Sequence, residues 1–169
     1  MNQQAIALEW IGTLRNAFER GAPWEPTYSA VVCDAAAALW MLGSSESASI
    51  IEDCIFTKVL PPDFRYPMRD ARLSMARLSA VQNRYDEAVI WFDRARRALD
   101  EQGARPLRTI ADYDEGLMYR RRNREGDVER AISFLQAAAT QFRALGMGGW
   151  LGRAESALAE LSKAGSSDV

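Results

Sequence analysis

The chain has 169 residues, of which 48% are hydrophobic and 26% are charged. This length suffices for a domain with a proper core, and the composition excludes a chain that is disordered throughout. The formal net charge is −2, from 21 basic and 23 acidic residues. No overall electric field therefore favours a nucleic acid or an acidic membrane surface as the partner.

Apolar residues recur at intervals of three and four along the chain, which predicts helices and no strands. The expected elements are a leading helix, three helical hairpins and a closing helix, over residues 2–20, 26–60, 67–101, 106–145 and 149–164. We expect these helices to form a single domain over residues 1–164, followed by a disordered tail over residues 165–169.

Glycine and proline mark the breaks between these elements. Gly103 and Gly146 suit the left-handed position that follows a helix end, and Pro106 suits the first turn of a helix. Finer breaks near Asn83 and Asn123 divide the second and third hairpins into two helices each.

Small residues also recur in register along the hairpins. They form pairs 12 residues apart in the first two hairpins and 15 apart in the third, at Ala36 and Ala48, Ala76 and Ala88, and Gly116 and Ala131. Small side chains at these positions would let the two helices of a hairpin approach closely, whereas large ones would force them apart.

Residues 83–95 read Asn-Arg-Tyr-Asp-Glu-Ala-Val-Ile-Trp-Phe-Asp-Arg-Ala. This run resembles the second-helix signature of tetratricopeptide repeats (TPR), in which a turn residue, an aromatic residue, acidic residues and two alanines recur at these spacings. The repeats here span 40 to 43 residues, longer than the usual length of about 34. In this they resemble the divergent repeat domains at the C-termini of bacterial LuxR-type regulators and of cyclase-linked ATPases.

The resemblance covers residues 26–161. It implies an all-α, TPR-like right-handed α-solenoid of about three helical hairpins with flanking helices. Such repeats present an extended concave face to their partners.

The sequence lacks the residues that most enzymes use. It contains no histidine, which removes the commonest general base and metal ligand. It has no phosphate-binding glycine loop, and neighbouring acids such as Asp112, Asp114 and Glu115 are more typical of a solvated helix face than of a cation or hydrolase site. We therefore expect no catalytic residue, no cofactor and no metal.

The cysteines and tryptophans are expected to lie mainly in the core. Cys33 and Cys54 have apolar neighbours, which favours two inert buried thiols over a redox pair. Core packing is likewise favoured over an aromatic ligand box for the five tryptophans, Trp10, Trp24, Trp40, Trp91 and Trp150.

The arginine run over residues 120–124 is the strongest local charge feature. Cations complement the dipole at a helix end, and the acidic residues that follow would neutralise them locally. Contact with a partner is the alternative, whereas a nucleic-acid site needs a wider basic stripe.

No apolar run reaches the roughly 18 residues of a membrane span, and the N-terminus lacks the basic region of a signal peptide. With only two cysteines, we expect a cytoplasmic protein without a membrane anchor.

The expected function is non-catalytic binding of a protein or peptide by a regulatory or scaffold module. The alternative is a small-molecule-sensing domain of a bacterial transcriptional or signalling regulator. Homo-oligomerisation is left open.

In tetratricopeptide repeats the first helix of each hairpin lines the concave face. The resemblance therefore implies a partner-binding set of Asp70, Ser74, Arg77, Tyr113, Asp114, Leu117, Arg120 and Arg121. Residues 65–130 carry 15 basic and 12 acidic side chains, which favours a partner with an acidic segment. The alternative is that these arginines pair with Asp70, Asp114 and their neighbours on a solvated face.

Overall fold

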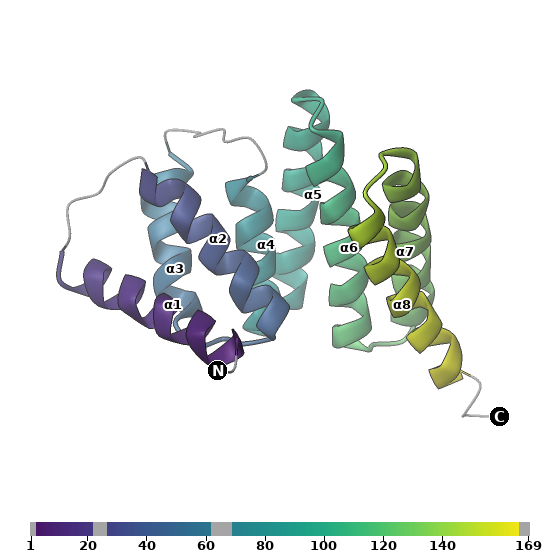
Figure 1. Cartoon of the computed structure of the whole chain (residues 1–169), viewed down its shortest axis with the longest axis horizontal. Helices are drawn as coiled ribbons and strands as arrows, with labels where there is room; N and C mark the ends of the chain where they lie inside the picture. The colour runs from purple at the N-terminus through teal and green to yellow at the C-terminus, as the bar shows by residue number, and fades with distance from the viewer. Residues whose placement is uncertain (1–2, 22–26, 62–68, 166–169) are drawn as a thin grey trace. The chain divides into compact units, whose positions relative to one another are not determined.

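The structure is a computed structural model that describes residues 3–21, 27–61 and 69–165 (Figure 1). The described residues form helices and no β-strand, which confirms the all-α prediction. The chain divides into two compact units, Met1–Arg94 and Ala95–Val169. The single domain over residues 1–164 stays a prediction, and most of the expected tail, residues 166–169, lies outside the described residues.

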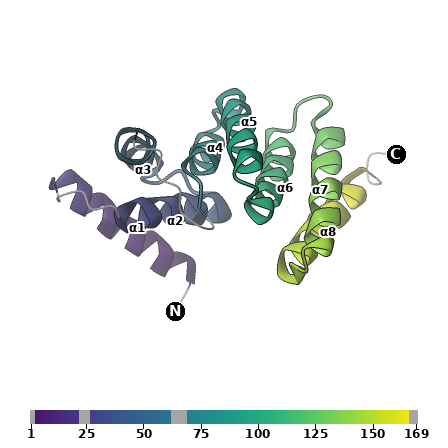
Figure 2. The ribbon, with the colours of Figure 1, turned by 90° about the horizontal axis from the view of Figure 1, so that it is seen from above.

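The described residues of the N-terminal unit form four helices, a short π-helix and the first part of a fifth helix. In chain order these are α1 (Gln3–Glu19), α2 (Thr27–Leu42), α3 (Ala48–Cys54), η1 (Ile55–Val59), α4 (Ala71–Val81) and α5 (Tyr85–Glu101). Helix α2 packs along α4, and α3 contacts both of these helices (Figure 2). Leu39, Ile51 and Leu78 are fully buried among them.

The C-terminal unit begins within α5 and continues with α6 (Arg105–Arg122), α7 (Asp127–Ala144) and α8 (Gly148–Gly165). Helices α6 and α7 form a hairpin, and α8 packs against α7 (Figure 2). The core of this unit contains Met118, Leu135 and Phe142, all without exposed surface.

The helices end where the sequence predicts breaks. Gly103 and Gly146 have φ angles of 65° and 70°, which confirms the left-handed positions after α5 and α7. Pro106 lies in the first turn of α6, as predicted. Asn123 ends α6 with a φ of 51°, a conformation that asparagine adopts more readily than most residues.

The small residues of the predicted register are all buried. Ala36, Ala48, Ala76, Ala88 and Ala131 have 0% exposed surface, and Gly116 is also buried. A Cβ atom on Gly116 would lie 2.9 Å from Cγ of Leu135 and 3.2 Å from Cβ of Phe134. Helices α6 and α7 therefore approach too closely for any side chain at residue 116.

We expect Ala131→Leu to lower the free energy of unfolding by about 1–3 kcal/mol, because three additional carbons must enter a filled core. Ala137→Leu on the same helix is the matched control, since Ala137 is exposed and the change should cost less than about 0.5 kcal/mol. Urea unfolding followed by circular dichroism measures both, and equal midpoints for the two variants would contradict the close packing described.

A buried ion pair holds the turn between α6 and α7. Asp127 has no exposed surface, and its Oδ2 and Oδ1 atoms accept hydrogen bonds from Nε and Nη2 of Arg122 at 2.8 and 2.7 Å. The backbone N–H of Arg124 donates to Oδ2 at 2.9 Å. The Arg122 hydrogen bonds, opposed by burial and assisted by Arg124, lower the pKa of Asp127 to about 2. The prediction that the arginine run is neutralised locally is confirmed for Arg122.

We expect Asp127→Asn to lower the free energy of unfolding at pH 7 by roughly 2 kcal/mol, because the depressed pKa of Asp127 stabilises the folded state while the carboxylate is ionised. As the pH falls below about 4 towards 2, Asp127 becomes protonated and this contribution is lost. The difference between variant and wild type should therefore shrink over that range in urea unfolding curves.

Glu125→Gln is the control for this experiment, because Glu125 is an exposed carboxylate in the same turn. A gap between Asp127→Asn and wild type that stays constant down to pH 2 would refute the role given to the ionised carboxylate.

The cysteines and tryptophans follow the prediction in part. Cys33 is buried, and burial raises the pKa of its thiol to about 11. Cys54 is only half-buried, so the prediction of two core thiols is wrong for it, although both thiols are free. Trp40 and Trp91 are buried, but Trp10 on α1 is 41% exposed. Trp150 is half-buried, and Trp24 lies outside the described residues.

Candidate functional site

The predicted partner-binding residues fall into both compact units. Asp70 caps the N-terminus of α4, where its Oδ1 atom accepts the backbone N–H groups of Arg72 and Leu73 at 2.9 and 3.1 Å. Ser74 is 1% exposed and donates to the backbone oxygen of Asp70 at 3.1 Å. These two side chains support α4 and offer a partner little surface, whereas Arg77 on the same helix is half-buried.

Three of the predicted residues line an open groove between α6 and α8, within the C-terminal unit. Tyr113, Leu117 and Arg120 occupy one face of α6 at intervals of four and three residues. Helix α8 supplies the opposite wall. The groove has a volume of about 510 Å³, and the lining residues of α8 are Gly149, Gly152, Arg153, Ser156, Ala157 and Glu160.

An aromatic cluster fixes one end of the groove. The ring of Tyr113 lies edge-on to the rings of Phe142 and Trp150, at centroid distances of 6.2 and 5.7 Å. Phe142 and Trp150 stack on each other at 5.8 Å with an interplanar angle of 27°. Since the three rings come from α6, α7 and α8, their contacts hold the two walls of the groove in place.

Charged side chains form the rim. The guanidinium of Arg120 pairs with the carboxylate of Glu160 across the groove, with Nη1 and Oε2 2.5 Å apart. The guanidinium of Arg153 lies 5.0 Å from the ring centre of Trp150, and Arg153 is exposed. The rim thus carries two guanidinium groups and one carboxylate, a local excess of positive charge.

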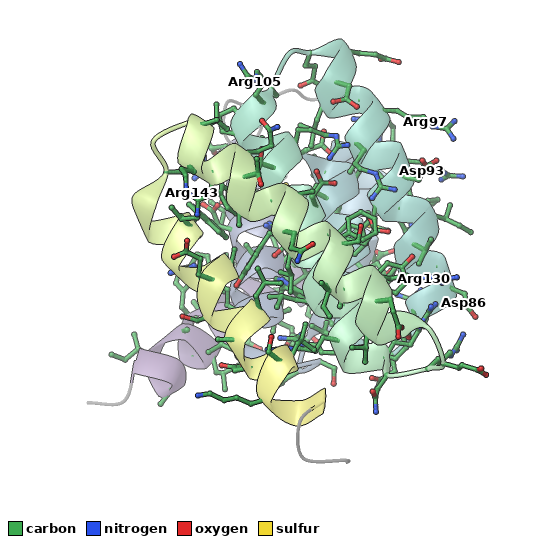
Figure 3. The ribbon with its side chains drawn as sticks, turned by 90° about the vertical axis from the view of Figure 1, so that its right-hand side faces the viewer. Asp86, Asp93, Arg97, Arg105, Arg130 and Arg143 are labelled. Carbon is green, nitrogen blue, oxygen red and sulfur yellow. The ribbon has the colours of Figure 1, made fainter. Side chains whose placement is uncertain are left out.

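A second ion pair links α7 to the wall formed by α8. Arg143 projects from α7 near its C-terminal end (Figure 3), and its Nη2 atom lies 2.9 Å from Oε1 of Glu155 on α8. Both side chains are more than half exposed, so the pair is screened by solvent and adds little stability.

Two glycines give the groove part of its depth. A Cβ atom built on Gly149 or Gly152 would meet no heavy atom within 4 Å. The space beside these residues is therefore open because they lack a side chain, and a larger residue would enter the groove without a clash against the core.

The other two predicted residues on α6 lie outside this groove. Asp114 is 2% exposed and Arg121 is exposed, and neither lines it. Glu115 is 1% exposed and forms an ion pair with Arg96 of α5. The expectation of a solvated face is thus wrong for Asp114 and Glu115, because α6 is buried on several sides.

The prediction also missed the residues of α8. It considered only the first helix of each hairpin and did not extend the same register to the closing helix. The signal was present, since Gly149, Gly152, Ser156 and Glu160 follow one another at intervals of three and four residues.

No protein-family model matches the chain, and no curated protein matches it significantly.

Over the residues that the structure describes, no group of three or more histidine, cysteine or acidic side chains is arranged to hold a metal ion. Within the same ranges, none of the helices combines the length and hydrophobicity that crossing a bilayer requires.

Proposed function

We propose that this protein is a non-catalytic binding module that holds an acidic peptide segment of a partner protein in the groove between α6 and α8. The observation that carries the proposal is the combination of an open groove, an excess of guanidinium groups on its rim, and apolar surface from Leu117 and Ala157 inside it. Arg120 and Arg153 are the proposed anchors for carboxylates.

The chemistry of the groove suits this ligand. A guanidinium group binds a carboxylate through two parallel hydrogen bonds, which fixes the orientation of an extended chain. In the free protein the guanidinium of Arg120 is paired with the carboxylate of Glu160. Because 66% of the Glu160 side chain is exposed, a carboxylate of the partner can displace it from Arg120. The flat ring of Tyr113 adds contact area of the kind that dominates interfaces.

We also propose the family and setting that the sequence suggests. The described hairpins would be TPR-like repeats of a right-handed solenoid, and the module would act in the cytoplasm as a regulator or scaffold. The regular turns, the buried register of small residues and the hairpin of α6 and α7 support this proposal.

The shape of the groove favours a peptide over a small molecule. Small ligands are usually held in enclosed, mainly apolar pockets that bury most of their surface. The groove between α6 and α8 is shallow and open to solvent, and its rim is charged. These properties suit a chain that passes along the surface.

A peptide-display selection against the protein tests the proposal. We expect selected peptides to carry acidic residues beside apolar ones, and their affinity to fall at least about tenfold in Gly152→Leu, whose side chain would fill the groove. Arg153→Ala should weaken binding about threefold to tenfold, and this loss should become smaller in high salt. Isothermal titration calorimetry measures each affinity.

Ala159→Leu is the matched control, because Ala159 is exposed on α8 but does not line the groove. It should bind selected peptides like the wild type. Peptides that bind Gly152→Leu with unchanged affinity, or a selection that yields no acidic peptides, would overturn the proposal. A thermal shift with metabolites that Gly152→Leu abolishes would favour the sensing alternative.

A further inference from the structure

The N-terminal unit contains a pocket of different character, which the proposed function does not use. It lies between α3, η1, α4 and α5 and has a volume of about 320 Å³. We call it the α3–α5 pocket; its apolar wall is Phe56, Met75 and Trp91, and its rim is Glu52, Asp53 and Glu87.

The π-helix η1 carries the aromatic ring of Phe56, which lies at the opening of this pocket. The backbone N–H of Leu60 bonds to the oxygen of Ile55 at 2.9 Å, five residues back, which widens the last turn after α3. Phe56 lies in this turn with 58% of its surface exposed, a large fraction for phenylalanine. Ile90, one turn from Glu87 on α5, is 53% exposed.

The rim carries more negative charge than its own arginine can neutralise. Arg84 pairs with both Glu52 and Glu87, and the Nε1 atom of Trp91 donates to Glu87 at 3.4 Å. The carboxylate of Asp53 is exposed and has no ion-pair partner among the described residues. Three carboxylates thus face one arginine at this rim.

The aromatic side of the pocket already holds a cation of the protein itself. The guanidinium of Arg94 lies 4.8 Å from the ring centre of Trp91, so one face of this indole is occupied, and the carboxylates of the rim are left to attract the cationic end of a ligand. Lys58 on η1 lines the neighbouring hollow beside Cys54 and does not line this pocket, whereas Asp53 lines both. Over the N-terminal unit as a whole, residues 1–94, the sequence has 12 acidic and 9 basic side chains.

We infer that the α3–α5 pocket is a second binding site, which takes an arginine or lysine side chain of a partner segment flanked by apolar residues. The aliphatic stem of that side chain lies against Phe56 and Met75, and its cationic end faces Asp53. The apolar neighbours in the partner cover Phe56. This site is separate from the groove in the C-terminal unit and selects for the opposite charge.

A titration by NMR spectroscopy tests this inference. The probe is a blocked peptide, acetyl-Ala-Leu-Arg-Leu-Ala-amide, and the readout is the indole N–H signal of Trp91, assigned through Trp91→Phe. We expect this signal to shift and saturate. Replacement of the peptide arginine by glutamine should weaken binding about fivefold or more.

Two variants locate the site, and two controls match them. Asp53→Asn and Phe56→Ala change exposed residues of the pocket, and each should weaken binding of the arginine peptide about threefold or more. Glu46→Gln and Met41→Ala change exposed residues that do not line it, and both should bind like the wild type.

Three results would overturn the inference. The first is a Trp91 signal that moves equally with the arginine and glutamine peptides, or does not saturate. The second is binding that Asp53→Asn and Phe56→Ala leave unchanged. The third is a wild-type dimer, detected by light scattering, that Phe56→Ala converts to a monomer, because a second copy of the chain would then cover this surface. None of these results tests the groove between α6 and α8, because a ligand in that groove would shift the indole N–H signal of Trp150 instead.

Discussion

The distance between α6 and α7 is set by the absence of a side chain at residue 116. Leu135 and Phe134 occupy the space that a Cβ atom of Gly116 would need. This close approach brings Tyr113 of α6 within ring contact of Phe142 on α7, and Phe142 in turn stacks on Trp150 of α8. The width of the groove between α6 and α8 therefore depends on how closely α6 packs against α7 at Gly116.

Buried charge adds specificity to this packing. Glu115 pairs with Arg96, and Asp127 pairs with Arg122, so two carboxylates with almost no exposed surface each meet a guanidinium group. Such a pair adds little stability compared with two apolar residues of the same size, but a helix that shifted along its axis would leave a charge buried without its partner. They thus disfavour alternative registers of α5, α6 and α7, which the many alanines alone would tolerate.

The helices were predictable because their signals are local. Spacing of apolar residues, and glycine or asparagine at the breaks, depend only on neighbours in the sequence, and the predicted left-handed Gly103 and Gly146 are confirmed. The site was harder to predict because exposure depends on residues far along the chain. Asp114 and Tyr113 are adjacent in sequence, yet only Tyr113 lines the groove, and the burial of Asp114 follows from helices packed around α6. The widened turn of η1 has no such local signal in its apolar spacing.

The glycines at the start of α8 have a consequence for the thermodynamics of binding. Gly148, Gly149 and Gly152 fall within the first five residues of this helix, and a glycine in a helix interior lowers helix stability by about 1 kcal/mol relative to alanine. We therefore expect the first turn of α8 to open more readily than the rest of the helix. If the proposed peptide binds there, ordering this turn would cost part of the binding free energy in conformational entropy and would lower the affinity.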